Sequence, residues 1–421
     1  MSSRSIGARL ILAGDEGRIR PAGWTPQSLD AHRRAFPHAT ADGLIDELAA
    51  AALRGRGGAC FPTAAKWQSV ASAGGPTVAV ANGEEGEPLS FKDRYLLLRR
   101  PHLVLDGLLL AAEALRAQRA VVYLSSTAAR RAVEHALRER GECGVEIVSV
   151  DPAYVAGEET SVVSAVNGER PIPKAKPPRP DQAGVAGLPT LVQNVETLAH
   201  VAWIRRHGAT AFRRAGTPTE PGTFLVTVGT AGGAPFLLEA QLGATLADVL
   251  ARTDVDPAGV RAVLAGGYFG GLLSDGALST PLADHTLRAL GSGLGCAAFT
   301  VLSAHDCPVD VAAEVLRYFA QESSGQCGAC VRGTGAMAAA VQRLRHGEAG
   351  PSDVEDLRRW STALRGRGAC ALLDGATIAA ASLLAHFAES VDRHLAETCA
   401  ACQGAPDGVA RDLVSMQPSI A

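Results

Sequence analysis

The chain has 421 residues, of which 47% are hydrophobic, so it is long enough for two to four domains with buried cores. A formal net charge of −3 excludes the strongly basic surface that nucleic-acid binding requires, and no apolar run approaches the roughly 20 residues of a membrane span. Because the N-terminus lacks a signal-peptide core, we expect a soluble, cytoplasmic protein whose nine cysteines are metal ligands or buried thiols rather than disulfides.

The first 150 residues predict a parallel α/β unit. Residues up to about 37 show little periodicity and are expected to form an extended arm with short strands. A helix is predicted from Asp42 to the glycines at 55–58. Apolar runs typical of buried parallel strands then alternate with helical patterns, with strands at 76–82, 120–126 and 145–150 and helices at 102–116 and 128–140. This alternation predicts a doubly wound sheet that binds ligands at the carboxyl ends of its strands.

The pattern changes after residue 150. A helical segment at 153–170 leads into a proline-rich extended stretch at 171–180, and helical spacing resumes at 189–204. Strand patterns around one short helix at 246–252 predict a small β-grasp-like module beginning near residue 221. From Val309 onward helical patterns dominate and predict a bundle with cysteines between its helices.

The stretch GRGGACFPTAAKW, residues 55–67, has the composition of a ligand loop. Its glycines allow the backbone to approach a ligand closely, and Lys66 follows within reach of an anion. A Walker A loop is excluded because Trp67 follows the lysine, where that motif has Ser or Thr. A Rossmann fingerprint is excluded because a helical pattern, not a strand, precedes the glycines.

Carboxylates gather after two of the predicted strands, in NGEEGEP at 82–88 and in AGEET at 156–160. Acidic side chains at these places cannot bind phosphate, but they accept hydrogen bonds from a ribityl chain, a ribose or a nicotinamide. Phosphate is then left to the glycine-loop amides, the following helix N-terminus and the lysines. The inventory fits a nucleotide or a flavin.

Six motifs occur in a fixed order: GRGGACFPTAAKW, NGEEGEPLSFKDR, AYVAGEET, KPPRP, QNVETLAHV and SSGQCGACVRGT. This set resembles the FMN- and NADH-binding flavoprotein subunit of respiratory complex I and the diaphorase subunits of NAD-linked hydrogenases and formate dehydrogenases, over roughly residues 53–388. The resemblance implies a Rossmann-like FMN domain, a ubiquitin-like β-grasp domain and a four-helix [4Fe-4S] domain. We expect these domains at 1–220, 221–303 and 304–398, followed by a tail with a cysteine pair at 399–421.

The resemblance also implies roles for single residues. The loop that wraps FMN corresponds to Gly55, Arg56, Gly57, Gly58 and Lys66. The other flavin-binding positions correspond to Asn82, Glu84, Glu85, Tyr154, Gly157, Glu158 and Asn194. Positions around NADH correspond to Phe61, Glu87, Glu159 and Lys176, with Glu87 as the catalytic candidate. A carboxylate at Glu159 would accept the ribose hydroxyls of NADH and repel the extra phosphate of NADPH.

Several of these positions depart from the family pattern. Cys60 stands where the family has glycine, and we expect it to be a buried, apolar side chain. Glu84 stands where aspartate is usual. The two aromatic positions that sandwich the adenine are Ser69 and Arg179, and Arg179 would either stack on the base or attract a 2′-phosphate. We expect NADH to be preferred over NADPH, with weaker affinity than is usual.

The ligands implied for the [4Fe-4S] cluster are Ser324, Cys327, Cys330 and Cys370, with serine in place of the first cysteine. A serine alkoxide is a harder donor than a thiolate and would lower the reduction potential. Either Cys399 or Cys402 is an alternative fourth ligand.

A different interpretation pairs Cys327 and Cys330 with Cys399 and Cys402 in a zinc site. The gap of about 70 residues between the two pairs is longer than is usual in a zinc module, and Cys370 is left without a role. Three further cysteines are interpreted as structural: Cys143, Cys296 and Cys307.

The function implied is oxidation of NADH by FMN, followed by single-electron transfer through the cluster to a partner with further redox centres. The partner is expected to be ferredoxin-like, quinone-linked or cytochrome-linked, with flow in either direction. The alternative is a non-catalytic scaffold that keeps FMN but has lost nicotinamide binding or the cluster. Bleaching of the flavin by NADH would distinguish the two.

Overall fold

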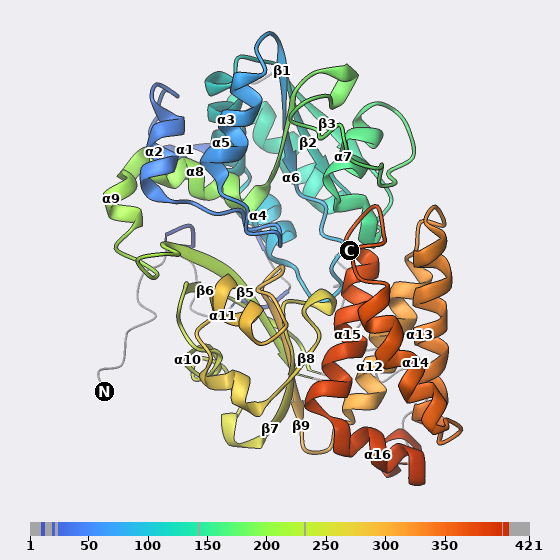
Figure 1. Ribbon diagram of the computed structural model, residues 1–421. Coiled ribbons are helices and arrows are strands. Elements are labelled where there is room, and N and C mark those ends of the chain that lie inside the picture. Colours follow the sequence, from blue (N-terminus) through green and yellow to red (C-terminus); the bar gives the residue numbers. More distant parts are fainter. Residues whose placement is uncertain are drawn as a thin grey trace.

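The computed structural model describes residues 10–12, 19–21, 24–141, 144–230, 233–397 and 399–403. Figure 1 shows a four-stranded sheet with its helices at the top, a second sheet below it, and a helical bundle beside the second sheet. The mixed α/β class predicted from the sequence is confirmed.

The first sheet consists of β1 (Thr77–Asn82), β2 (Ala117–Leu124), β3 (Val145–Ser149) and β4 (Thr190–Asn194). All neighbours are parallel and the strand order is β3-β2-β1-β4. The chain therefore proceeds from β1 outward to β3 and then returns to the other side of β1, which makes the β1–β4 boundary a topological switch point.

Helices cover both faces of this sheet, which explains why its central strands are apolar throughout. They are α1 (Leu29–Ala35), α2 (Leu44–Ala51), α3 (Thr63–Ser72), α4 (Lys92–Arg99), α5 (Pro101–Ala114), α6 (Thr127–Arg140), α7 (Glu159–Val166), α8 (Val195–His207) and α9 (Ala209–Phe212).

Two parts of this domain differ from the sequence prediction. The N-terminal arm predicted to be extended contains helix α1, whose first turn is capped by the Ser28 hydroxyl. The segment predicted to be helical from residue 189 begins instead with strand β4. Asn194 ends this strand and caps α8, accepting a hydrogen bond from Glu196 N at 3.0 Å. A strand of 5 residues that runs directly into a helix is too short to interrupt the helical pattern.

The second sheet consists of β5 (Thr223–Thr230), β6 (Phe236–Gln241), β7 (Val260–Leu264), β8 (Leu272–Ser274) and β9 (Ala298–Ser303). Its order is β6-β5-β9-β7-β8, with β5 and β9 parallel in the centre and the other pairs antiparallel. The short helices α10 (Leu246–Leu250) and α11 (Asp284–Ala289) accompany it. A mixed sheet with a parallel central pair is the arrangement of the β-grasp fold.

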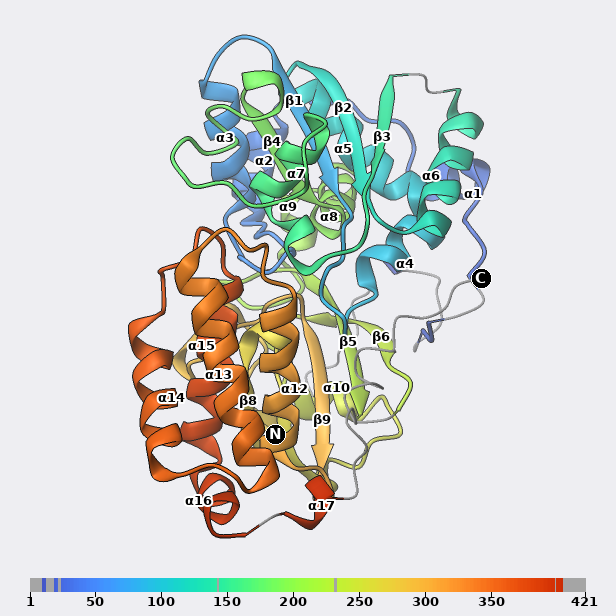
Figure 2. The ribbon, with the colours of Figure 1, turned by 90° about the vertical axis from the view of Figure 1, so that its right-hand side faces the viewer.

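The bundle consists of α12 (Pro308–Gln321), α13 (Gly328–His346), α14 (Pro351–Ala363) and α15 (Leu372–His386), followed by α16 (Ala388–Ala396) and α17 (Ala400–Gln403). It is fixed to the second sheet by a buried hydrogen bond of 2.9 Å from Leu272 N of β8 to Ser382 Oγ of α15. Figure 2 shows α17 near the end of β9, at the end of the bundle that lies away from the first domain. No helix in the described ranges is both long and apolar enough to cross a membrane.

Candidate flavin, nucleotide and metal sites

The carboxyl ends of β1 and β4 bring two asparagines together at the switch point. Asn82 and Asn194 are partners in the parallel register. Asn82 donates from Nδ2 to Gly157 O at 2.8 Å, and Asn194 donates from Nδ2 to Asp93 Oδ2 at 2.7 Å. Each amide thus anchors a loop beside the crevice where a doubly wound sheet binds its ligand.

The glycine-rich loop lies against this switch point. It closes on itself through a 2.8 Å hydrogen bond from Gly55 N to Phe61 O. A Cβ on Gly57 would come within 3.1 Å of Asn194 Cβ, and Gly58 has a φ of +105° and pairs with Gly295 of the β-grasp domain. The loop therefore packs its backbone into a space that leaves no room for a side chain at residue 57.

Three side chains of the loop have different surroundings. Phe61 is 51% exposed, which is unusual for a large apolar side chain. Arg56 is buried and donates from Nε to Thr223 O and from Nη1 to Arg54 O, each at 3.0 Å. Cys60 is buried in the β-grasp core, and this burial raises its pKa to about 11. The expectation of a buried, unreactive thiol at Cys60 is confirmed.

The carboxylates after β1 fall into two kinds. Glu85 accepts hydrogen bonds from Ser90 Oγ at 2.6 Å and from the Asp93 and Arg94 amides at 3.2 Å, so it caps helix α4. Glu84 and Glu87 are buried instead, and burial raises the pKa of Glu84 to about 7 and that of Glu87 to about 8.

Three carboxylate oxygens of these two residues lack a partner. Both oxygens of Glu84 and Oε1 of Glu87 are buried without a hydrogen bond to any part of the chain that the structure describes. Glu87 Oε2 accepts from Tyr268 N at 3.0 Å, which places Glu87 at the boundary with the β-grasp domain. Buried acceptors without partners are rare in folded proteins and indicate groups that a ligand satisfies.

The carboxylates before α7 form a network with two lysines. Glu158 caps the helix, accepting from Thr160 N at 2.7 Å, and it pairs with Lys176 Nζ at 2.8 Å. Glu159 pairs with Lys176 at 2.7 Å and with Lys66 at 3.3 Å. Burial opposes the ionisation of Glu159, but the two lysines lower its pKa below the usual value. Lys66, expected near FMN, thus lies beside Glu159, expected near NADH.

Tyr154 connects this region to the bundle. It begins the single 3-10 turn Tyr154–Gly157, and its N–H donates to Glu322 Oε2 at 2.8 Å. Its ring packs edge-on against Tyr318 and Phe319 of α12, with centroid separations of 5.8 and 5.3 Å.

The two residues at the expected adenine positions are exposed and polar. Ser69 Oγ donates to Asp181 Oδ2 at 2.5 Å, which ties α3 to the segment that follows the prolines. Arg179 N donates to Gln182 Oε1 at 3.0 Å within that segment.

The four predicted cluster ligands line one cavity. Ser324, Cys327, Cys330 and Cys370 all border it, and Val155 of the Tyr154–Gly157 turn closes one side. Cys327 Sγ accepts a hydrogen bond from Ala369 N at 3.4 Å, which holds the α13 N-terminus against the loop before α15. Three sulfur donors and a hydroxyl around one cavity fit an iron–sulfur cluster.

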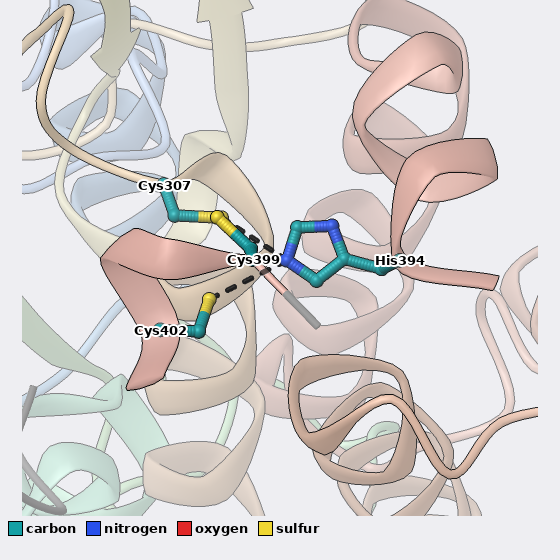
Figure 3. Close-up of side chains that lie close together, drawn as sticks. All are labelled: Cys307, His394, Cys399 and Cys402. Carbon is teal, nitrogen blue, oxygen red and sulfur yellow. Dashed lines mark hydrogen bonds between the residues drawn. The ribbon is translucent and has the colours of Figure 1, made fainter. Parts of the chain in front are cut away.

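A second group of metal-binding side chains lies elsewhere. Cys307, His394, Cys399 and Cys402 have their ligand atoms within 4.8 Å of one another (Figure 3). Cys307 directly precedes α12 and Ser324 follows it, and α12 has 14 residues, so the two groups are about 20 Å apart.

This arrangement corrects three interpretations of the cysteines. Cys399 and Cys402 do not complete the cluster site, and they do not share a site with Cys327 and Cys330. Cys307, interpreted as structural, belongs to the second group. The signal that would have found it is the spacing His394-x4-Cys399-x2-Cys402. Cys296 lies outside both groups, and Cys143 is outside the described residues.

Comparison with known proteins agrees with this geometry. Residues 48–203 match the family described as Nuo51 FMN-binding domain, and residues 310–394 match the NADH-ubiquinone oxidoreductase-F iron-sulfur binding region. The second NADH-quinone oxidoreductase-F protein of Rhizobium meliloti (strain 1021) is 34% identical over 388 residues, which cover 87% of this chain and 92% of that protein. The NADH-quinone oxidoreductase-F protein of Rickettsia typhi is 30% identical over 375 residues, or 84% of this chain and 89% of that protein.

A solved structure gives the same result. The crystal structure of an NAD+-reducing [NiFe]-hydrogenase in the H2-reduced state aligns with a TM-score of 0.77 and 34% identity over 84% of this chain. The alignment covers 63% of the hydrogenase chain, so this chain is similar to only part of that protein. From these matches, the chain belongs to the NADH-quinone oxidoreductase-F family of FMN-binding and iron–sulfur-binding proteins.

Proposed function

We propose that the chain holds FMN at the β1–β4 switch point, accepts NADH beside it, and passes electrons to a cluster at the start of α13. The observation that carries this assignment is the set of unpartnered carboxylate oxygens of Glu84 and Glu87, next to a loop with no room for a side chain at Gly57. Bound FMN supplies hydride acceptance and single-electron release, chemistry that no side chain provides.

The FMN phosphate is assigned to the glycine-loop amides, the α3 N-terminus and Lys66. Helix α3 begins at Thr63, so Lys66 lies in its first turn, where backbone N–H groups are free to bind an anion. Lys66 is 3.3 Å from Glu159 and can turn from that carboxylate to the phosphate. Asn82, Asn194 and Glu84 are assigned to the ribityl chain and the ring, since their oxygens accept and their amides donate.

NADH is assigned to the side of the crevice formed by Phe61, Glu87, Glu159 and Lys176. The exposed Phe61 ring offers an apolar surface on which a nicotinamide or adenine ring can pack. Glu159 stays ionised because of its two lysine partners, so it accepts ribose hydroxyls and repels a 2′-phosphate. Glu87 is the candidate that contacts the reacting ring, and its high pKa allows it to donate or accept a proton there.

The path from the flavin to the cluster is assigned to the Tyr154–Gly157 turn. A Cβ on Gly157 would lie 3.3 Å from Glu84 O on the flavin side, whereas Val155 lines the cluster cavity. Two residues of one turn thus touch both sites, which keeps the distance for electron transfer short.

Ser324, Cys327, Cys330 and Cys370 are assigned as the cluster ligands. Membership of the family implies that further redox proteins accept the electrons. We assign the acceptor to a ferredoxin-like, quinone-linked or cytochrome-linked protein, with flow in either direction. Family membership favours this function over a non-catalytic scaffold, for which no contact among the described residues argues.

The test separates the two cofactors. In the Cys370→Ser variant, NADH should still bleach the flavin, whereas the electron paramagnetic resonance signal of the reduced cluster should be altered or lost. Cys296→Ser is the matched control, because Cys296 does not line the cavity, and it should keep the wild-type iron content. An unaltered cluster signal in Cys370→Ser would show that the ligand assignment is wrong.

A further inference from the structure

The side chains of Cys307, His394, Cys399 and Cys402 converge from three segments of the chain. Cys307 precedes α12, His394 lies on α16, and the two other cysteines lie at α17. Cys307 and His394 are 87 residues apart, so their contact is a product of the tertiary fold. Figure 3 shows the three thiols and one edge of the imidazole facing a common centre. Cys307 and Cys402 are buried, and no disulfide joins any of the three cysteines.

The distances match a single tetrahedral ion. With Zn–S near 2.3 Å and Zn–N near 2.05 Å, tetrahedral angles put sulfur about 3.6 Å from nitrogen and sulfurs about 3.8 Å from one another. His394 Nε2 is 3.5 Å from Cys307 Sγ and 3.4 Å from Cys402 Sγ. All four ligand atoms lie within 4.8 Å, which is compact for a four-iron cluster, where each thiolate binds a different iron at a corner of a cube.

The imidazole is already oriented for metal binding. Its Nδ1 is 2.6 Å from Ser390 O, and a carbonyl oxygen only accepts, so Nδ1 carries the proton. In the neutral ring Nε2 then has a free lone pair, and it is Nε2 that faces the thiols. Metal-bound histidines almost always have such a partner for the other nitrogen.

An arginine of the β-grasp domain supports two neighbours of the group. Arg261 of β7 donates from Nη1 to Asp306 O at 3.1 Å and from Nη2 to Ser390 Oγ at 3.0 Å. Asp306 precedes the ligand Cys307, and Ser390 is the residue that orients His394. The group therefore joins the β-grasp domain, the start of the bundle and the end of the described chain.

We propose that Cys307, His394, Cys399 and Cys402 bind a structural zinc ion. Three thiolates and one imidazole complete a closed tetrahedral site, which leaves no open position for a substrate. The net charge of −1 lies at the N-terminus of α12, where the helix dipole favours an anion. The ion fixes α16 and α17 to the β9–α12 junction. This site is independent of the flavin and cluster assignments, since α12 separates it from the cluster cavity.

Metal analysis of the purified holoprotein and its variants tests the proposal. Wild type should contain roughly one zinc per chain in addition to its iron. Cys402→Ser should lose most of the zinc and keep the iron, and Cys370→Ser should affect the iron and keep the zinc. Cys296→Ser, a cysteine outside both groups, should keep both. Wild-type zinc in Cys402→Ser, or a loss of iron in that variant at full zinc occupancy, would overturn the assignment.

A second measurement does not depend on the folding of a variant. Zinc-edge X-ray absorption of the wild-type holoprotein should show three sulfur ligands near 2.3 Å and one nitrogen near 2.0–2.1 Å. Absence of zinc from protein produced with zinc supplied, or a shell of nitrogen and oxygen only, would refute the proposal.

Discussion

Replacement of Gly57 tests the flavin site most sharply through packing. A Cβ at this position would lie 3.1 Å from Asn194 Cβ and 3.6 Å from Asn194 Cγ. Asn194 cannot retreat easily, because it caps α8 at 3.0 Å and holds Asp93 at 2.7 Å. The loop must therefore move away from the switch point. Overpacking of this kind costs about 1–3 kcal/mol, so we expect Gly57→Ala to weaken FMN binding about 5- to 150-fold.

The assay is the ratio of flavin to protein after gel filtration, together with fluorescence titration of flavin-free protein with FMN. Iron content should stay unchanged, because the cluster cavity does not include the loop. Gly259→Ala is the matched control, since a Cβ there has nothing within 4 Å, and it should bind FMN as wild type does. Wild-type affinity in Gly57→Ala, and also in the bulkier Gly57→Leu, would refute the loop assignment.

Three further predictions concern charges. Lys92 is 1% exposed and pairs with Asp93 at 2.7 Å and Glu196 at 3.0 Å, so Lys92→Met should lower the free energy of unfolding by about 3–5 kcal/mol in urea denaturation, whereas the exposed Lys174→Met should change it by less than about 1 kcal/mol; equal effects would contradict the buried pair. Folding raises the pKa of Glu84 from 4.5 to about 7 and that of Glu87 from 4.5 to about 8, so this contribution to stability is complete below about pH 4.5 and is lost as pH rises through 7 and 8; the Tm of flavin-free protein should fall over that window, and a Glu84→Gln variant with the same pH profile would contradict it. Glu159→Gln removes a charge-assisted hydrogen bond worth about 1.5–3 kcal/mol, so kcat/KM for NADH should fall about 10- to 150-fold while the NADPH-to-NADH ratio rises; Glu169→Gln should leave both unchanged, and an unchanged ratio in Glu159→Gln would exclude the ribose role.

Much of the fold was predictable because its elements carry strong local patterns. Strands β1, β2 and β3 are continuous apolar runs bounded by polar turns, and helix α6 ends at Gly141 in a left-handed cap. Strand β4 was missed because its pairing with β1 is non-local and its 5 residues merge into α8. Helix α1 was missed because only its Ser28 cap marks its start, in a segment without clear periodicity.

The sites show the same division. Motif order brought the four cavity-lining ligands together correctly, because Ser324, Cys327 and Cys330 are close in sequence and Cys370 precedes a helix. The second metal group was misread because Cys307 is 87 residues from His394 and no local pattern joins them. The unpartnered state of Glu84 and Glu87 likewise depends on burial, which the composition of a turn does not reveal.

Anaerobic titration of the purified holoprotein with NADH tests the central claim most directly. The account predicts that NADH bleaches the flavin spectrum, that the electron paramagnetic resonance signal of a reduced iron–sulfur cluster then appears, and that NADPH acts far more slowly. A flavin that stays oxidised in the presence of NADH, or one that NADPH reduces much faster, would contradict it.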